Sequence, residues 1–502
     1  MSIASGTTLT VLDKGSLVQV NDAGTNTING TFNMTRLADI RKYDYVFWSS
    51  PVLNFPLTTL SSGTNSAYVW NWNTTVVNPN GGFGNWENTL ENMVTGKGYI
   101  VRGSDTFSNA TTQTFTANFT GTPHNGVYTP TISRENYQGV NYLGTNLATI
   151  TNNDDNWNLV GNPYPSAIKA MDFITVNTNI DGNVRLWTHG TLPSSAITSP
   201  YYNSYTNNYS PNDYIVYNGT ATTSGPTGFN GYIAAGQSFL VLMNDGAATT
   251  ETVTFNNSMR KTTNNDQFYK QSNLKNNLER HRIWLDLVSS TGVANRTVVG
   301  YIEGATQQKD RLFDAYTNIG GTQDFYSLID NKTMVIQGRA LPFSPDDMVP
   351  MGIVVPNNGT YTISIANVDG LFATNFQNIY LEDKQLNIIY DLKTAPYSFT
   401  ANAGTFNNRF QLRYTNTKLK NTEFNSTDNQ VVITSNNQEI LIISAIEKIS
   451  SVSVFDVLGR KILSLENIND TNARIEKSKF ATEVLVLKIK LENGEVITKK
   501  VL

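Results

Sequence analysis

The sequence predicts an all-β protein: tandem antiparallel β-sandwich modules followed by a small C-terminal β-sandwich. Short runs rich in Val, Ile, Thr and Tyr alternate in polarity, as in residues 8–20, 98–103 and 361–368, and this period is typical of strands. Clusters of Asn, Gly and Asp separate the runs, and these residues tolerate the positive φ of tight turns. Helical periodicity is expected only over residues 165–174 and 307–316.

Composition limits the class of protein further. The 502 residues suffice for two to four domains, and 39% hydrophobic with 11% aromatic residues can fill their cores. Charged residues are only 15% and the net charge is −4, which disfavours nucleic acid as a partner. The absence of Cys excludes disulfides and thiol nucleophiles. No apolar run reaches the length of a membrane-spanning helix, so we do not expect a transmembrane protein.

Changes in pattern along the chain predict its domains. We expect a β-rich module at 1–145, a second at 146–278, a β-sandwich at 279–416, a linker at 417–429 and a last domain at 430–502. The 85 residues from position 418 hold 23 of the 76 charged residues and lack Trp, Tyr, Pro and His, so composition changes sharply there.

The second module could be a duplicate of the first. Trp48-Ser49-Ser50-Pro51 corresponds to the motif NWNLVGNPYP at 156–165. Each is followed by a Gly-led strand, at Gly96 and Gly236, and a Phe lies 19 residues beyond each Gly. The other interpretation of these matches is coincidence in a β-rich chain.

Strands and turns are clearest in the last domain. Strands are expected at 430–435, 439–444, 451–458, 461–468, 483–491 and 495–502. Asn493-Gly494 is a strong hairpin signal and should pair the last two strands antiparallel.

Two stretches of this domain resemble the type A C-terminal sorting domain of substrates of the type 9 secretion system of Bacteroidota. VSVFDVLGRKILS resembles the first family motif through Phe455, Asp456, Gly459 and Arg460. NGEVITKKVL resembles the last motif, and the residues that carry this match are Gly494, Lys499, Lys500, Val501 and Leu502. The family's usual Gly-aromatic pair before the final hairpin is absent, since residues 480–484 are FATEV.

The resemblance implies an immunoglobulin-like sorting domain, export through the periplasm and outer membrane, and a cell-surface or extracellular location. It implies partners as well: the outer-membrane translocon barrel and its carrier barrel, which would bind residues 430–502, and a sortase-like peptidase. Such a protein needs a signal peptide, and the first residues, MSIASGTTLTVLDKG, have no basic or apolar segment of that kind. We therefore expect the chain to be a piece of a longer protein.

The body resembles, more loosely, the region that precedes this signal in large flavobacterial surface and adhesin-like proteins, some of them linked to gliding motility. The strings WNLVGNPYPSAI, GYIEGATQQKDRLFDA and RFQLRY carry this resemblance. It implies adhesion or binding and no enzymatic activity. Two alternatives stay open: the non-catalytic C-terminal region of a larger secreted hydrolase, and a structural spacer without a ligand.

Two kinds of residue in the body could form a binding site. Trp70, Trp72 and Trp86 lie among Asn-rich turns and could form a glycan platform, although core packing is the simpler interpretation. Pairs of Asp could bind calcium through their oxygen atoms, although capping of turns is the simpler role; the predicted ligands are Asp154, Asp155, Asp310 and Asp314. No other cofactor is expected, and no catalytic motif is present around the three His.

Overall fold

Strands dominate the structure, which confirms the all-β class. The computed structural model contains 38 strands, one α-helix and five short 3-10 helices among the residues it describes. It describes the chain except for residues 78–82, 136–141, 144–148, 151–154, 196–206, 227, 267–278, 293, 318–322, 375, 417–430, 436–437, 446, 478–483 and 502. The predicted linker at 417–429 lies outside the described residues. No helix of the described part is long and apolar enough to cross a membrane.

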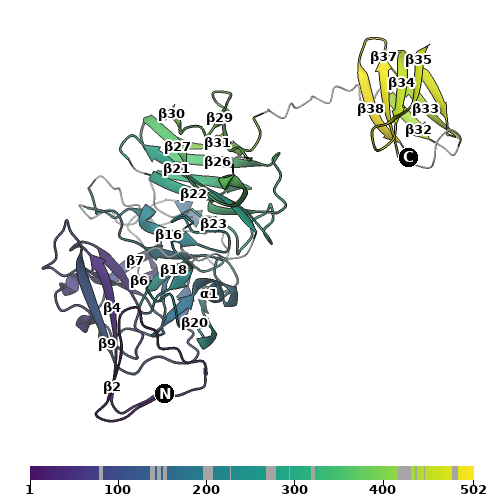
Figure 1. The fold of residues 1–502 in the computed structure, drawn as a ribbon. Coiled ribbons are helices and arrows are strands. Elements are labelled where there is room, and N and C mark those ends of the chain that lie inside the picture. The colour runs from purple at the N-terminus through teal and green to yellow at the C-terminus, as the bar shows by residue number, and fades with distance from the viewer. Residues whose placement is uncertain are drawn as a thin grey trace. The chain divides into compact units, whose positions relative to one another are not determined.

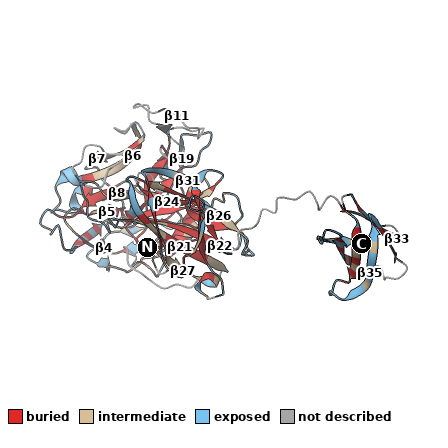
Figure 2. Ribbon diagram, turned by 90° about the horizontal axis from the view of Figure 1, so that it is seen from above, coloured by how far each residue is buried: buried red, intermediate tan, exposed pale blue. Residues whose placement is uncertain are grey.

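The chain divides into two compact units, Met1–Asn416 and Thr417–Leu502 (Figure 1). The division lies where the charged fraction of the sequence rises. Within the first unit the buried residues form separate cores for its successive parts, and Figure 2 shows them in red on the inner strands.

The N-terminal part of the first unit contains a four-stranded sheet of order β5-β8-β6-β7 and a three-stranded sheet of order β2-β4-β9. Trp48, Phe115 and Phe119 belong to the core that these strands share. The strands are β1 Ser2–Ile3, β2 Thr8–Val11, β3 Thr27–Ile28, β4 Thr31–Ile40, β5 Tyr45–Trp48, β6 Val69–Val77, β7 Phe83–Asn88, β8 Tyr99–Arg102 and β9 Gln113–Thr120.

The next part has a four-stranded sheet of order β13-β18-β15-β16. If the four strands of each sheet are numbered in chain order, this sheet and β5-β8-β6-β7 have the same spatial order: first, fourth, second, third. Its elements are β10 Thr131–Ser133, β11 Tyr142–Leu143, β12 Thr149–Ile150, β13 Trp157–Gly161, β14 Ala167–Lys169, α1 Ala170–Val176, β15 Val184–Trp187, β16 Tyr214–Tyr217, β17 Tyr232–Ile233, β18 Ser238–Leu242, β19 Thr250–Thr252 and β20 Arg260–Lys261.

The two four-stranded sheets meet through reciprocal backbone contacts. Trp48 forms a β-bridge with Gln237, and Val160 forms one with Lys97. The pairing of β5 with β8 and of β13 with β18 makes Trp48 equivalent to Val160 and Lys97 equivalent to Gln237. The two bridges are therefore the same contact made in both directions.

Two hydrogen bonds repeat this reciprocity. Ser49 N–H donates to the carbonyl of Gly236 at 2.8 Å, and Gly161 N–H donates to the carbonyl of Gly96 at 2.9 Å. Gly96 and Gly236 have nearly equal φ of +76° and +74°. Two copies of one module that are related by a local two-fold axis would show these matches. The matches therefore support the proposal of a duplication.

The third part forms one 11-stranded sheet. Its order is β29-β28-β31-β26-β24-β25-β22-β21-β27-β30, with β23 paired to β25. Side chains from both ends of this sheet, such as Leu381 and Phe399, belong to one core, so the sheet curves back on itself. The strands are β21 Arg280–Ser289, β22 Ala294–Ile302, β23 Ala315–Tyr316, β24 Asp324–Ile329, β25 Lys332–Arg339, β26 Met348–Val355, β27 Gly359–Val368, β28 Tyr380–Asp383, β29 Ile388–Asp391, β30 Tyr397–Ala401 and β31 Gly404–Arg413.

Residues 307–316 do not form the predicted helix; they form a turn that ends in β23. The Asp314 carboxylate accepts the N–H groups of Asp310 and Gly338, and this fixes the segment as a loop against β25. The Arg311 guanidinium donates to carbonyls at the end of α1 and beyond it, at Ile174, Asn177 and Ile180. The Asp314 N–H also bonds to the Asp310 carbonyl at 2.9 Å, but this single turn is not continued as a helix.

The second unit has two sheets, of order β32-β33-β36 and β35-β34-β37-β38, which share one core. Six of its seven strands overlap the predicted ones, because these follow a local period of two, and the seventh, β36, was not predicted. They are β32 Val431–Ser435, β33 Glu439–Ser444, β34 Ile449–Phe455, β35 Lys461–Asp470, β36 Asn472–Glu476, β37 Leu485–Leu491 and β38 Val496–Val501.

The contact between the two four-stranded sheets leaves no room for a side chain at Gly161. A Cβ atom there would lie 2.3 Å from both Cβ and Oγ of Ser49. We expect Gly161→Ala to lower the free energy of unfolding of the first unit by about 1–3 kcal/mol, the usual range for overpacking. Tryptophan fluorescence during urea unfolding measures this unit alone, since all seven Trp lie in it.

Gly246→Ala is the matched control, because nothing lies within 4 Å of a Cβ atom at Gly246. It should change the stability by less than about 1 kcal/mol. Equal effects of the two substitutions would contradict the close approach of the sheets.

Candidate functional site: the recognition surface of the C-terminal unit

The first motif of the C-terminal unit forms a tight turn between β34 and β35. Asp456 Oδ1 accepts the N–H groups of Leu458 at 2.9 Å and Arg460 at 2.8 Å, and its Oδ2 accepts Arg460 Nε at 2.6 Å. Gly459 adopts a φ of +79°, which favours glycine. Asp456 therefore holds the turn together, and Gly459 allows the chain to reverse.

The two charged residues of this turn have different roles. The Asp456 side chain is 5% exposed and the Arg460 side chain is 76% exposed. The Arg460 backbone N–H, followed by its guanidinium, lowers the pKa of Asp456 below its ordinary value. Val457 and Leu458, at the tip of the turn, are 65% and 77% exposed. The motif thus presents two aliphatic side chains and a guanidinium to solvent.

The alternation predicted for β34 is confirmed. Val452, Val454 and Asp456 are buried, whereas Ser453 and Phe455 are half-buried on the opposite face. The Lys488 ammonium lies 5.4 Å from the centre of the Phe455 ring, a cation–π distance.

The second motif forms the predicted hairpin of β37 and β38. Gly494 has a φ of +89°, and Glu495 N–H donates to Asn493 Oδ1 at 2.9 Å. β38 lies at the edge of its sheet and pairs only with β37 among the described strands. A strand in this position presents backbone N–H and C=O groups that can pair with another chain. Leu502 lies outside the described residues.

Residues of the two motifs lie on the same face of this sheet. Phe455 pairs with Lys461 on β35 and with Val486 on β37, and Val486 pairs with Lys500 on β38. Directly paired residues share a face, so Lys461, Phe455, Val486 and Lys500 form a row across the four strands; we call it the outer-face row. Strand spacing places Phe455 and Lys500 about 10 Å apart, although they are 45 positions apart in sequence.

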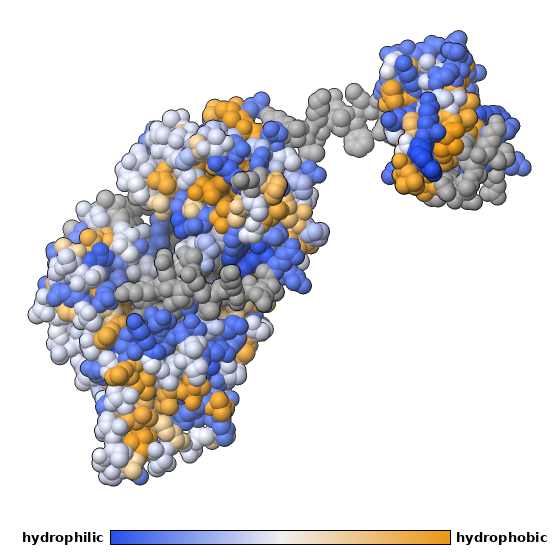
Figure 3. Space-filling view, viewed as in Figure 1, coloured by the Kyte–Doolittle hydropathy of each residue, from blue (hydrophilic) through white to orange (hydrophobic). Residues whose placement is uncertain are grey.

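The surface near the outer-face row mixes charge with exposed apolar groups, and Figure 3 shows both on the visible face of the C-terminal unit. Val496 on β38 and Ile462 on β35 are 55% and 44% exposed. Val486 and Lys488 were not singled out from the sequence. The register that the Asn493-Gly494 turn imposes places Val486 beside Lys500, and this signal could have found it.

The three Trp predicted as a glycan platform lie together in the first unit, where they pack around an aromatic cluster shared by its two four-stranded sheets. Trp72 Nε1 donates to the Trp157 carbonyl at 2.8 Å, and the Trp72 ring meets the Trp86 ring edge-on at 5.0 Å. Trp70 Nε1 donates to the Tyr45 hydroxyl at 3.2 Å. All three side chains are half-buried, and their N–H groups or rings take part in packing.

Of the Asp residues predicted as calcium ligands, Asp310 and Asp314 lie together in one turn, where the Asp310 N–H donates to Asp314 Oδ2. Asp155 is buried 3.6 Å from Arg134, and Asp154 lies outside the described residues. Burial raises the pKa of Asp314 to about 7, and both of its oxygens accept backbone N–H groups. Among the described residues no group of three or more His, Cys, Asp or Glu could hold a metal ion.

The comparisons with known proteins give families without an assigned activity. A family described as "Domain of unknown function (DUF8693)" matches residues 1–414, and one described as "Domain of unknown function (DUF8694)" matches residues 419–502. No curated protein matches the chain. A solved structure, Tp47, the 47-kilodalton lipoprotein of Treponema pallidum, is 9% identical, with a TM-score of 0.13 over 45% of this chain and 86% of that one. A similarity this low supports no conclusion.

Removal of the Asp456 carboxylate should open the first turn. We expect Asp456→Ala to speed hydrogen exchange of the Leu458 and Arg460 amides, measured by NMR, because both lose their acceptor. The pKa of Asp456 is lowered on folding, so the stability it contributes is present above about pH 4 and is lost as the pH falls through the lower folded value.

Glu492→Ala is the matched control for this experiment. Glu492 is an exposed carboxylate in the other tight turn of the same unit, and its side chain has no hydrogen-bond partner among the described residues. If the two substitutions had the same effect on these amides, Asp456 would not be what holds the turn.

Proposed function

The chain belongs to the family described as a domain of unknown function, DUF8693, and because that description assigns no activity, we propose its function from the C-terminal unit. This unit is the signal that directs the protein through the type 9 secretion system, across the periplasm and outer membrane, to the cell surface or the medium. Its partners are the outer-membrane translocon barrel and its carrier barrel, with a sortase-like peptidase acting on the exported protein.

The observation that carries the proposal is the outer-face row. The two motifs that resemble the family signal are separated in sequence, and folding places Phe455 and Lys500 in one row, with Val486 of β37 between them. A receptor that binds this face reads both motifs at once and distinguishes the folded unit from an unfolded tail. The exposed edge of β38 adds backbone groups for strand pairing.

The shape of the first turn supports the same proposal. Val457 and Leu458 are the most exposed large apolar side chains in the described part of the unit, and they are adjacent at the tip of the turn. An apolar contact with a partner would bury them.

The two Lys of β38 provide a test. Residues 417–502 have a core of their own, so they can be fused behind a signal peptide and a fluorescent reporter in a Bacteroidota host. We expect the Lys499→Ala/Lys500→Ala fusion to lose most of its export, measured as reporter at the cell surface and in the medium relative to the periplasm.

The control fusion carries Lys448→Ala/Arg474→Ala, which removes two exposed charges that lie outside the four strands of the sheet that contains β38. We expect this fusion to keep at least half of the wild-type export. If both double variants were exported as well as the wild type, the edge strand would not be part of the signal.

A further inference from the structure

A cavity of the first unit lies between its second and third parts. It has a volume of about 260 Å³, slightly below the usual ligand-pocket range of roughly 300–1,000 Å³. Pro211, Asn212, Tyr214 and Ile215 line one side, and residues of β21, β22 and β24 line the other. Boundaries between packed parts of a chain are frequent positions for ligand sites. The volume suits one small ring rather than a long chain.

The walls of the cavity are fixed by contacts between the two parts. Trp284 Nε1 donates to the Thr222 carbonyl at 2.8 Å, and Trp284 and Val335 share a small core with Val216. Asn212 Nδ2 donates to the Ala294 carbonyl at 3.2 Å. A site built on strands that are held in this way needs little ordering when a ligand binds.

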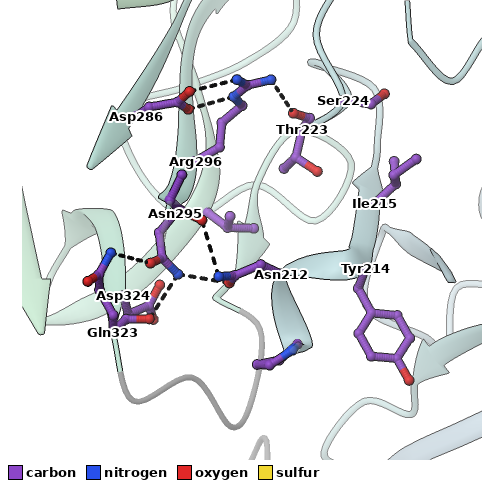
Figure 4. Close-up of a pocket in the computed structure, with 13 residues that line it drawn as sticks. Asn212, Tyr214, Ile215, Thr223, Ser224, Asp286, Asn295, Arg296, Gln323 and Asp324 are labelled. Atoms are coloured by element: carbon purple, nitrogen blue, oxygen red, sulfur yellow. Dashed lines mark hydrogen bonds and ion pairs between the residues drawn. The ribbon is translucent and has the colours of Figure 1, made fainter. Parts of the chain in front are cut away.

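One wall is polar and preorganised. Arg296 donates to Asp286 through two parallel bonds of 2.6 and 2.7 Å. Asn295 Nδ2 donates to Asn212 Oδ1 and to the Gln323 carbonyl, both at 2.8 Å, and its Oδ1 accepts Gln323 Nε2 at 2.9 Å. These planar groups hold one another in position, and Figure 4 shows them along one side of the cavity.

Asp324 belongs to the same wall, and one of its carboxylate oxygens is available for a hydrogen bond with a ligand. Its Oδ1 accepts the Phe325 N–H at 2.8 Å, and its second oxygen has no hydrogen-bond partner among the described residues. Burial raises the pKa of this carboxyl to about 7. It can therefore accept a hydrogen bond or, when protonated, donate one.

The opposite wall is largely apolar. Ile215 of β16 lies across the cavity from Asn295 and Arg296 (Figure 4), and Pro211 belongs to the same side, whereas the Tyr214 ring packs against Trp187 at 4.9 Å. A polar wall that faces an apolar one suits a ring with hydroxyl groups on its edge and C–H groups on its face.

The charged residues that line the cavity disfavour an anion or a bare divalent cation as its ligand. The one Arg of its lining is already paired with Asp286, and Asp324 adds a further acidic group. No excess positive charge is left for an anion. The described residues offer no cluster of three metal ligands here, so a bare divalent cation is not favoured either.

We propose that this cavity binds a single neutral sugar ring, with Asp324, Arg296 and Asp286 bonding its hydroxyl groups and Ile215 contacting its face. The site is independent of the export signal, since it lies in the other unit. It also differs from the Trp70, Trp72 and Trp86 group predicted from the sequence.

The test is saturation-transfer difference NMR on the full chain. The probes are the methyl glycosides of glucose, galactose, mannose, fucose and N-acetylglucosamine, with methyl glucuronide as the anionic comparison. We expect saturation of at least one neutral glycoside and at least tenfold weaker binding of methyl glucuronide. Asp324→Ala and Ile215→Trp, which change opposite walls, should each weaken the neutral glycoside at least tenfold.

Two control variants should bind as the wild type does. Asp346→Ala removes an exposed carboxylate from the same part of the chain, and Trp70→Phe alters the tryptophan group. Unfolding followed by tryptophan fluorescence checks that each variant is folded. The proposal is overturned if no neutral glycoside binds, if methyl glucuronide binds equally well, or if binding survives both pocket substitutions in folded protein.

Discussion

The first unit depends on the close backbone approach of β5 and β13 at Ser49 and Gly161. The N–H groups of these two residues bond to the carbonyls of Gly236 and Gly96, and this reciprocal pair fixes the two four-stranded sheets relative to each other. Their facing side chains then have one arrangement available, the aromatic cluster in which Phe47 stacks on Trp187 at 5.9 Å. A side chain at Gly161 would separate the strands, and the fit of these rings would be lost with the bonds.

In the second unit, one tight turn determines the register of the strands. The Asn493-Gly494 turn sets the register of β37 against β38, and a slip of one residue would move Lys500 to the buried face. The register of β34 against β37 then places Phe455 in the same row. The candidate recognition surface is thus a consequence of strand pairing, and its chemistry comes from the side chains that this pairing leaves on the outer face.

The sequence was most informative where structure follows from neighbours in the chain. Six of the seven strands of the second unit and its final hairpin could be predicted, because the period of two and the Asn-Gly turn are local signals. The segment 307–316 was predicted wrongly as helix, because Asp314 and Arg311 are bonded to residues far away in sequence. The cavity could not be predicted at all, since Asn212, Arg296 and Asp324 come together only when two parts of the chain pack. The outer-face row lies between these cases: its two motifs could be found in the sequence, but their position on one face of the sheet depends on the strand order.

The central claim, that the C-terminal unit is an export signal, is tested most directly by dependence on the translocon. The fusion of a signal peptide, a fluorescent reporter and residues 417–502 would be expressed in a Bacteroidota host with and without its type 9 translocon, and the reporter located by fractionation. The account predicts surface or extracellular reporter in the intact strain and periplasmic reporter in the strain without the translocon. Periplasmic reporter in both strains, or export from both, would contradict it.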